Sequence, residues 1–291
     1  MVRSTLLSFR SFQWCSLFFF LFACTAPQNT SLPDEGSFSV LTYNVHGLPP
    51  EVTGDETSVR IAQIATFLSD FDIVGLQEDF SDENHERIAS TVRHPYQNRF
   101  NQKLSEDRYY GSGLSALSYF PIAAVQNTHY DSCHGYIDAS SDCLASKGFQ
   151  LIELMLTDGH SIHLYNSHLE AGGSDEDLQV RQQQVTKLID SLQGYSADKA
   201  VIFVADTNLH STDADDVLLL EQLEAEGGLS DACLTVSCPE SNHIDRIFYR
   251  NGPMIEFTVN EWIRDQRFVD DNGVDLSDHP AIVATIDWFV R

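Results

Sequence analysis

Basic residues are scarce in this chain. Its 291 residues include 17 lysines and arginines against 43 aspartates and glutamates, which gives a formal net charge of −26. Only four of the basic residues are lysines. A protein that neutralises several phosphates of a nucleic-acid backbone needs lysine and arginine gathered on one face. The composition therefore disfavours a nucleic-acid partner, although a local basic cleft is compatible with an acidic whole.

The sequence also lacks internal repeats, low-complexity blocks and any linker long enough to divide it after its first forty residues. The hydrophobic content of 42% is sufficient for a sizeable core, and 21% charged residues is too little for a disordered chain. We therefore expect one α/β domain with more than one layer of sheet.

The N-terminus has the composition of a targeting segment. Arg3 and Arg10 precede an apolar run over residues 15–23, which ends at Cys24 in the sequence LFAC. This ending resembles a bacterial lipobox, so we predict a signal peptide over residues 1–24 with a lipid-modified Cys24, followed by a polar tether over residues 25–37. Secretion with plain cleavage is the alternative, and a membrane anchor is disfavoured because the run is shorter than the ~20 residues of a span.

Four cysteines follow this leader in two close pairs, Cys133 with Cys143 and Cys233 with Cys238. Local pairs in an exported protein predict two disulfides. A zinc site is the rival interpretation, but neither pair has CxxC spacing and only His134 stands close by.

Short apolar runs with strand character alternate with segments of helical spacing. The expected strands cover residues 38–44, 71–78, 111–122, 150–156, 161–168, 200–208, 242–250 and 280–290. The expected helices cover residues 58–70, with Ser58 as a candidate N-cap, and residues 81–92, 176–192 and 213–226. Residues 150–168 form the clearest hairpin.

Polar side chains recur where the apolar strands end. They are Asn44, Glu78, His168, Asp206, Asn208, Asp245, Asp278 and His279. Asp206 and Asn208 stand two residues apart, so a continued strand would place them on one face, where they suit a hard cation or a phosphate. A polar strand end running into an Asx-turn is the structural alternative.

Glu78 is the natural anchor for a divalent cation, because carboxylates are the ligands that Mg²⁺ prefers. The neighbours Asp278 and His279 suggest a proton carrier with a carboxylate to orient it. Because adjacent strand residues face opposite sides, Asp245 is an equal candidate for orienting His279. Singly, each of these residues is also compatible with a solvated strand end or a polar turn.

Seven ordered motifs resemble the endonuclease/exonuclease/phosphatase superfamily. They are TYNVHGLP (42–49), VGLQE (74–78), GSGLSALSYFPI (111–122), NSHLEAG (166–172), VADTN (204–208), IDRIFY (244–249) and LSDHPAIVAT (276–285). The resemblance spans about residues 38–291, the expected catalytic domain. One departure is Ala205, where the family's GDxN motif has glycine, and we expect this small change to be tolerated.

The resemblance implies a four-layer α/β sandwich, with two mixed β-sheets face to face, helices outside and a site at one rim. It also implies a divalent metal cofactor, Mg²⁺ or alternatively Mn²⁺ or Ca²⁺. By the same resemblance, Glu78 is the principal ligand with Asn44 beside it. Asp206 and Asn208 position the attacking water and bind the phosphate or a second metal.

The remaining roles are also implied by the resemblance. His279 is the general base, and His168 stabilises charge that develops on the phosphoryl oxygens. Asp245 and Asp278 orient a histidine or bind metal. Such a set suits an in-line displacement at phosphorus, which needs charge withdrawal, a base for water and donors around the phosphoryl oxygens.

The segment DCLASKGFQLIEL (142–154) resembles the neutral sphingomyelinase branch, and this resemblance places Lys147 near the site, where it assists phosphate binding. A surface lysine in a turn is the alternative. We therefore predict an exported phosphodiesterase that hydrolyses a phospholipid headgroup ester at a membrane surface, as a monomer. Trp262 and Phe268 are weak candidates for membrane contact, and packing within the sheet is the favoured interpretation of both.

Three alternatives remain open at this point. A secreted deoxyribonuclease-like endonuclease is supported by IDRIFY (244–249). A phosphoinositide phosphatase belongs to the same superfamily. An inactive binding lipoprotein on the same fold is the alternative of another class, although every position that the chemistry needs is filled.

Overall fold

The computed structural model describes residues 34–136, 142–240 and 242–291. The predicted signal peptide with Cys24 and most of the predicted tether lie outside these ranges. None of the helices in the described part of the chain combines the length and apolar character that crossing a bilayer requires.

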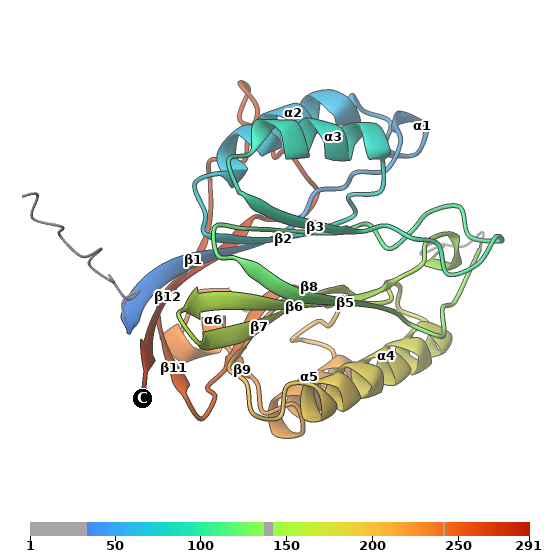
Figure 1. The fold of residues 1–291 in the computed structure, drawn as a ribbon. Coiled ribbons are helices and arrows are strands. Elements are labelled where there is room, and N and C mark those ends of the chain that lie inside the picture. The colour runs from blue at the N-terminus through green and yellow to red at the C-terminus, as the bar shows by residue number, and fades with distance from the viewer. Residues whose placement is uncertain (1–33, 137–141, 241) are drawn as a thin grey trace, which may run out of the picture. The chain divides into compact units, whose positions relative to one another are not determined.

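Two six-stranded sheets form the centre of the fold (Figure 1). The first sheet has the order β11 (Ile255–Arg264), β12 (Ile282–Val290), β1 (Glu35–Asn44), β2 (Ile73–Gln77), β4 (Leu114–Ser118) and β3 (Tyr96–Phe100). The second has the order β5 (Ile122–His129), β6 (Gly148–Thr157), β7 (His160–His168), β8 (Val201–Asp206), β10 (Asp245–Arg250) and β9 (Ser230–Asp231). Each sheet contains one parallel pair, β1 with β2 and β7 with β8, and is otherwise antiparallel.

Helices cover the outer face of each sheet, so the fold has four layers (Figure 1). The first sheet carries α2 (Thr57–Leu68) and α3 (Asp82–Thr91), and the second carries α4 (Asp175–Gly194) and α5 (Ala214–Ala225). Three short helical segments complete the set: α1 (Pro50–Thr53), η1 (Asp142–Leu144) and α6 (Ala232–Val236). The predicted four-layer α/β sandwich is confirmed.

The apolar pattern of the strands explains the layering. Every residue of β2, β4 and β8 is buried, as expected for strands covered on both faces. Phe38, Ile73, Ile152 and Ile202 belong to one cluster between the sheets. A separate hydrophobic cluster lies between each sheet and its helices. Ile64 of α2, for example, belongs to the cluster between the first sheet and its helices. The polar strand ends are thereby fixed at the rim of a rigid double sheet.

Several boundaries differ from the expected ones. β1 begins at Glu35, inside the predicted tether, because residues 35–42 pair with β12. The helix expected from Ser58 begins at Thr57 with Glu56 as its N-cap, so Ser58 is inside the helix and does not cap it. The hairpin of β6 and β7 is confirmed.

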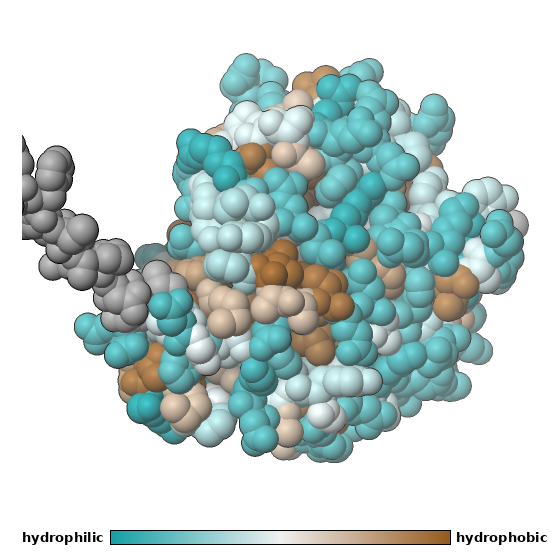
Figure 2. Space-filling model, viewed as in Figure 1, coloured by the Kyte–Doolittle hydropathy of each residue, from teal (hydrophilic) through white to brown (hydrophobic). Residues whose placement is uncertain are grey.

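Edge strands were not anticipated. β5 exposes Ala123, Ala124 and Val125, which places an apolar stretch on the surface. Figure 2 shows hydrophobic residues gathered in the middle of this face of the molecule. Trp262 and Phe268 are 5% and 3% exposed, so these two weak candidates for membrane contact pack inside the protein instead.

Candidate active site

Strand pairing brings the predicted site residues to one rim. The parallel pair β1 and β2 sets Asn44 beside Gln77, with Glu78 next in the chain. The parallel pair β7 and β8 sets His168 beside Asp206 in the other sheet. Because the two sheets pack face to face, the ends of these four strands meet.

A single amide joins two acidic residues across the sheets. The Nδ2 atom of Asn44 donates to Glu78 Oε1 at 3.0 Å and to Asp206 Oδ2 at 2.9 Å. The second oxygen of Glu78, Oε2, is buried without a hydrogen-bond partner in the part of the chain that the structure describes. Burial, followed by the charge of Asp206, raises the pKa of Glu78. Two largely buried carboxylates with an unpaired oxygen fit a hard divalent cation, which oxygen ligands bind best.

The orientation of Asn44 differs from its expected role. Its Oδ1 accepts from the backbone N–H of His46 at 3.0 Å, so its nitrogen faces the two carboxylates. An N–H donor has no lone pair for a cation. Asn44 therefore bridges Glu78 and Asp206 in this structure, and acting as a ligand would require its amide to turn over.

His279 is held by Asp245. The ring Nδ1 lies 2.9 Å from Asp245 Oδ2 and 3.1 Å from Oδ1, and Nε2 lies 3.7 Å from Asp206 Oδ2. Burial works against the charged ring, but the hydrogen bond that His279 Nδ1 donates to Asp245 and the charge of Asp206 outweigh it and raise the pKa of His279 to about 10. His279 therefore carries a proton at neutral pH in this arrangement, and the predicted base role requires that pKa to fall.

Asp278 faces a different histidine. Its Oδ1 lies 3.3 Å from His46 Nδ1 and accepts from Ser277 Oγ, and its side chain is 58% exposed. Asp278 therefore does not orient its neighbour His279, and of the two candidates Asp245 makes that contact. His46, which also lies 3.9 Å from Glu78 Oε2, was missed. His46 follows the strand-end residue Asn44 by two positions, as Asn208 follows Asp206. This spacing could have identified His46 as a candidate site residue from the sequence.

His168 lies between an acid and a lysine. Its Nε2 is 3.4 Å from Asp206 Oδ2 and 3.3 Å from Lys147 Nζ. Burial and the charge of Lys147 lower the pKa of His168 to about 3, so the ring is neutral. A neutral imidazole offers one N–H donor, which suits the predicted role toward phosphoryl oxygens.

Lys147 is buried and does not lie on the surface. Its Nζ pairs with Asp142 Oδ1 at 2.7 Å and donates to the carbonyl of Leu169 at 2.6 Å. The alternative of a surface lysine in a turn is excluded. Lys147 therefore lies at the edge of the candidate site, where it contacts the site residue His168.

Backbone strain gathers at this rim. His46, Glu78 and Asn208 have φ of 47°, 59° and 51°, and among described non-glycine residues only Ser237 shares such a φ. Left-handed backbone is unfavourable for most residues and clusters at functional sites. Asn208 lies beyond the end of β8, and its backbone N–H donates to Asp206 Oδ1 at 3.1 Å. The strand does not continue through residue 208. The prediction that Asp206 and Asn208 lie on one face of a continued strand was therefore wrong.

Gly47 supports the turn at Glu78. Its N–H donates to the Glu78 carbonyl at 3.1 Å, and a Cβ at this position would lie 2.3 Å from the same oxygen. Only glycine allows the backbone to approach Glu78 this closely.

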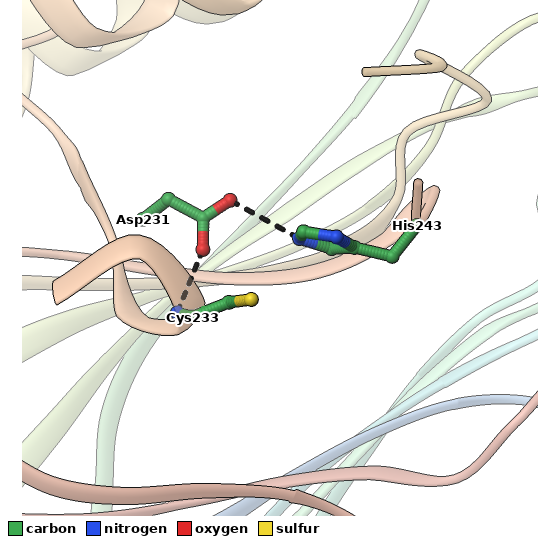
Figure 3. A group of neighbouring side chains, drawn as sticks. All are labelled: Asp231, Cys233 and His243. Atoms are coloured by element: carbon green, nitrogen blue, oxygen red, sulfur yellow. Dashed lines mark hydrogen bonds and ion pairs between the residues drawn. The ribbon is translucent and has the colours of Figure 1, made fainter. Parts of the chain in front are cut away.

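A second group of potential ligands, Asp231, Cys233 and His243, lies outside this rim (Figure 3). The Arg246 guanidinium lies 2.7 Å from Asp231 Oδ2 and 3.0 Å from His243 Nε2, which places a fixed positive charge where a cation would bind. Cys233 is oxidised to a disulfide with Cys238. This group is therefore a buried ion-pair network.

Both predicted disulfides are present, Cys133–Cys143 and Cys233–Cys238. The zinc alternative fails because none of the four sulfur atoms is a free thiolate.

Two facing mixed sheets, outer helices and a rim of buried carboxylates and histidines define the class of DNase-I-like α/β sandwich proteins. The chain belongs to the endonuclease/exonuclease/phosphatase family 2, whose family model matches residues 41–226. The superfamily expected from the seven motifs is confirmed.

Curated relatives support the expected branch. The chain is 27% identical over 269 residues to a sphingomyelinase of Mycobacterium tuberculosis, an alignment that covers 85% of this chain and 52% of the relative. It is 26% identical over 277 residues to a putative neutral sphingomyelinase of Drosophila melanogaster, covering 86% of this chain and 61% of the relative. The chain thus spans about half to three fifths of the length of these relatives.

Solved structures share the fold. Sphingomyelinase C from Streptomyces griseocarneus superposes with a TM-score of 0.65 at 21% identity, covering 86% of this chain and 99% of that one. A beta toxin mutant from Staphylococcus aureus with bound magnesium ions gives a TM-score of 0.65 at 17% identity and the same coverage.

Proposed function

We propose that this chain is an exported, Mg²⁺-dependent phosphodiesterase of the sphingomyelinase kind, which releases a phospho-headgroup from a sphingolipid or related lipid. The observation that carries the proposal is the buried Glu78 Oε2, which lies 3.9 Å from His46 Nδ1 but has no hydrogen-bond partner in the described part of the chain. Its carboxylate shares the Asn44 amide with Asp206, which lies beside the His279–Asp245 pair. The similarity to sphingomyelinases supports the choice of a lipid phosphodiester. The net charge of −26 favours a lipid surface over a polyanion as substrate.

Glu78 and Asp206 would hold the cation, with Asp278 and a turned Asn44 as further candidate ligands. When bound, a divalent ion withdraws charge from the phosphate. Mn²⁺ and Ca²⁺ share the preference for oxygen, so the ion is part of the test.

The histidines and Lys147 would act on the phosphate and its protons. His279, oriented by Asp245, carries the proton exchanged at the reacting oxygen, and neutralising the charge of Asp206 would lower the pKa of His279, which is the direction that a base role requires. Neutral His168 donates an N–H to a phosphoryl oxygen, with Asn208 at the same edge. Burial and the charge of Lys147 keep His168 neutral, and Lys147 adds positive charge to this side of the phosphate.

The proposed location follows from the leader and the disulfides. Two disulfides are stable in an oxidising compartment, which agrees with export. A lipid on Cys24 would hold a monomeric enzyme at the membrane that contains its substrate.

The deciding experiment is phosphocholine release from sphingomyelin vesicles by residues 25–291, with Mg²⁺ and with EDTA. We expect release with Mg²⁺ and none with EDTA. His279→Ala should lose about 10²- to 10⁴-fold in rate, the usual contribution of a positioned acid or base. His160→Ala, at the first residue of β7 and the opposite end of that strand from His168, is the folded control with full activity.

Absence of release from a folded, metal-loaded protein would remove the sphingomyelinase proposal. Nicking of plasmid DNA would then favour the deoxyribonuclease-like alternative, and release from phosphoinositides the phosphatase alternative. No metal-dependent turnover of any of these substrates would favour a binding lipoprotein.

A further inference from the structure

The amide of Asn166 joins the two sheets just beneath the rim of the candidate active site. Asn166 belongs to β7 of the second sheet and is fully buried. Its Nδ2 lies 3.1 Å from the carbonyl oxygen of Leu76 and 3.0 Å from that of Ser115, both in the first sheet. Its Oδ1 accepts from Gln77 Nε2 at 2.8 Å. One side chain of the second sheet therefore binds two neighbouring strands of the first, β2 and β4.

The bonds of Asn166 end next to the residues of the rim. Asn166 stands two residues before His168 in β7, and alternate residues of a strand face the same side. Gln77 directly precedes Glu78 at the end of β2. Its Nε2 also donates to Thr42 Oγ1 of β1 at 3.2 Å, so the network reaches a third strand of the first sheet. A displacement of this network is therefore transmitted to the rim through very little backbone.

The sheets approach closely at this level because β2 has no side chain at Gly75. A Cβ at Gly75 would overlap the Val204 Cγ2 atom of β8 and lie 3.2 Å from Asn166 Oδ1. Val204 pairs with Asn166 in the parallel register of β7 and β8, and it stands two residues before Asp206. The spacing of the sheets beneath Glu78 and Asp206 is thus set by one polar side chain and by the absence of another side chain.

The direct link at the rim cannot hold this spacing once a cation binds. Asn44 donates to both Glu78 and Asp206 in this structure, and a cation held by the two carboxylates would replace those hydrogen bonds. Asn166 makes no hydrogen bond to either carboxylate, so its bonds between the sheets would persist. Mg²⁺ requires short ligand distances in near-ideal geometry, so even a small change in the spacing would cost affinity.

We propose that Asn166 is a positioning residue for the cation. It holds the Glu78 side and the Asp206 side of the rim at the separation that Mg²⁺ requires, and it touches neither the ion nor the phosphate. The inference rests on the proposed metal-dependent function and adds a residue that controls Mg²⁺ affinity through the spacing of the sheets. A buried amide with a purely structural role would affect the stability of the fold alone.

Asn166→Ala tests the inference, because it removes every contact of the amide and adds no new group. Mg²⁺ binding to residues 25–291 is measured by isothermal titration calorimetry, at a temperature where circular dichroism shows each variant to be folded. Ile202→Ala is the matched control. Ile202 is fully buried between the same two sheets, but it stands four residues before Asp206, roughly 13 Å along β8.

We expect Asn166→Ala to raise the Kd for Mg²⁺ about tenfold or more, the lower end of what is lost when a residue that holds metal ligands in place is removed. Ile202→Ala should lower Tm and keep the wild-type Kd. Gln77→Leu, which removes the partner of Asn166 Oδ1, should also raise the Kd, and it takes the place of Asn166→Ala if that variant does not fold. A wild-type Kd in the folded test variant, or an equal rise in Ile202→Ala, would overturn the inference.

The proposed function is judged separately, because the calorimetric measurement contains no lipid. A wild type that binds Mg²⁺ but releases no phosphocholine would remove the sphingomyelinase proposal and leave the role of Asn166 to be decided by the Kd values. A wild type that binds no Mg²⁺ would overturn both the metal-dependent function and this inference.

Discussion

Glu78→Gln should make the metal-free protein more stable and abolish its response to Mg²⁺. Without a cation, Glu78 and Asp206 place two acidic groups against one Asn44 amide, and burial raises the pKa of Glu78. Glutamine keeps an oxygen for Asn44 and replaces the carboxylate with a neutral amide, so the repulsion between Glu78 and the charge of Asp206 is removed. Removing such strain typically stabilises a protein by about 0.5–2 kcal/mol.

The assay is thermal unfolding in EDTA and in Mg²⁺. A stabilisation of 1 kcal/mol raises Tm by about 2–4 °C in a domain of this size, so Glu78→Gln in EDTA should melt roughly 1–8 °C above the wild type. Mg²⁺ at a hundred times its Kd should stabilise the wild type by about 2.7 kcal/mol and leave the variant unmoved. Glu51→Gln, an exposed glutamate of α1, should match the wild type in both conditions.

The pH dependence has a definite sign. A carboxyl whose folded pKa lies above its unfolded value binds its proton more tightly in the fold, so metal-free stability should decline as pH rises above about 4.5, the ordinary pKa. Glu78→Gln should reduce that decline. A variant that melts lower than the wild type in EDTA and still responds fully to Mg²⁺ would refute the reasoning.

Three further predictions concern other residues. In EDTA, Asp245→Asn should lower the pKa of His279 from about 10, because the burial of His279 persists while the carboxylate charge that favours its protonated ring is lost; an NMR titration still near 10 would contradict the pairing. Burial and Lys199 lower the pKa of His163 to about 4, so stability should fall as pH drops from about 6.5 toward 4; His163→Gln should flatten that part of the unfolding curve, and an unchanged slope would count against it. Gly47→Ala should cost about 1–3 kcal/mol and weaken the Mg²⁺ response, because its Cβ would displace the Glu78 carbonyl; Gly173→Ala, with nothing within 4 Å of its Cβ, is the control, and equal melting of the two would exclude the clash.

The buried strands and the residues at their ends were predictable from the sequence. β8 is a short apolar run that ends at Asp206, and the same pattern places Glu78 after β2. Such runs are fully buried in the double sheet, so hydrophobicity alone marks them. Edge strands lack such an apolar run. β3 has the sequence YQNRF and is half exposed, so its strand conformation depends on pairing with β4.

The contacts within the site depended on the tertiary structure. The sequence pattern left Asp245 and Asp278 as equal candidates for orienting His279. The antiparallel pairing of β10 with β8 sets Asp245 opposite Asp206, and this places Asp245 beside His279. The direction of the Asn44 amide depends on the backbone of His46, whose left-handed turn no short motif encodes.

The placing of β12 between β1 and β11 has a consequence for the order of events during folding. Glu35 pairs with Phe289, so the first and last strands of the described chain are neighbours, and His279 stands just before that last strand. Contacts between residues so distant in sequence form slowly and late. During synthesis, Glu78 and Asp206 are added to the chain well before His279. The acidic side chains of the rim can therefore be in place before the histidine that contacts Asp206 joins them. The rim would therefore be completed among the last steps, when the first sheet closes.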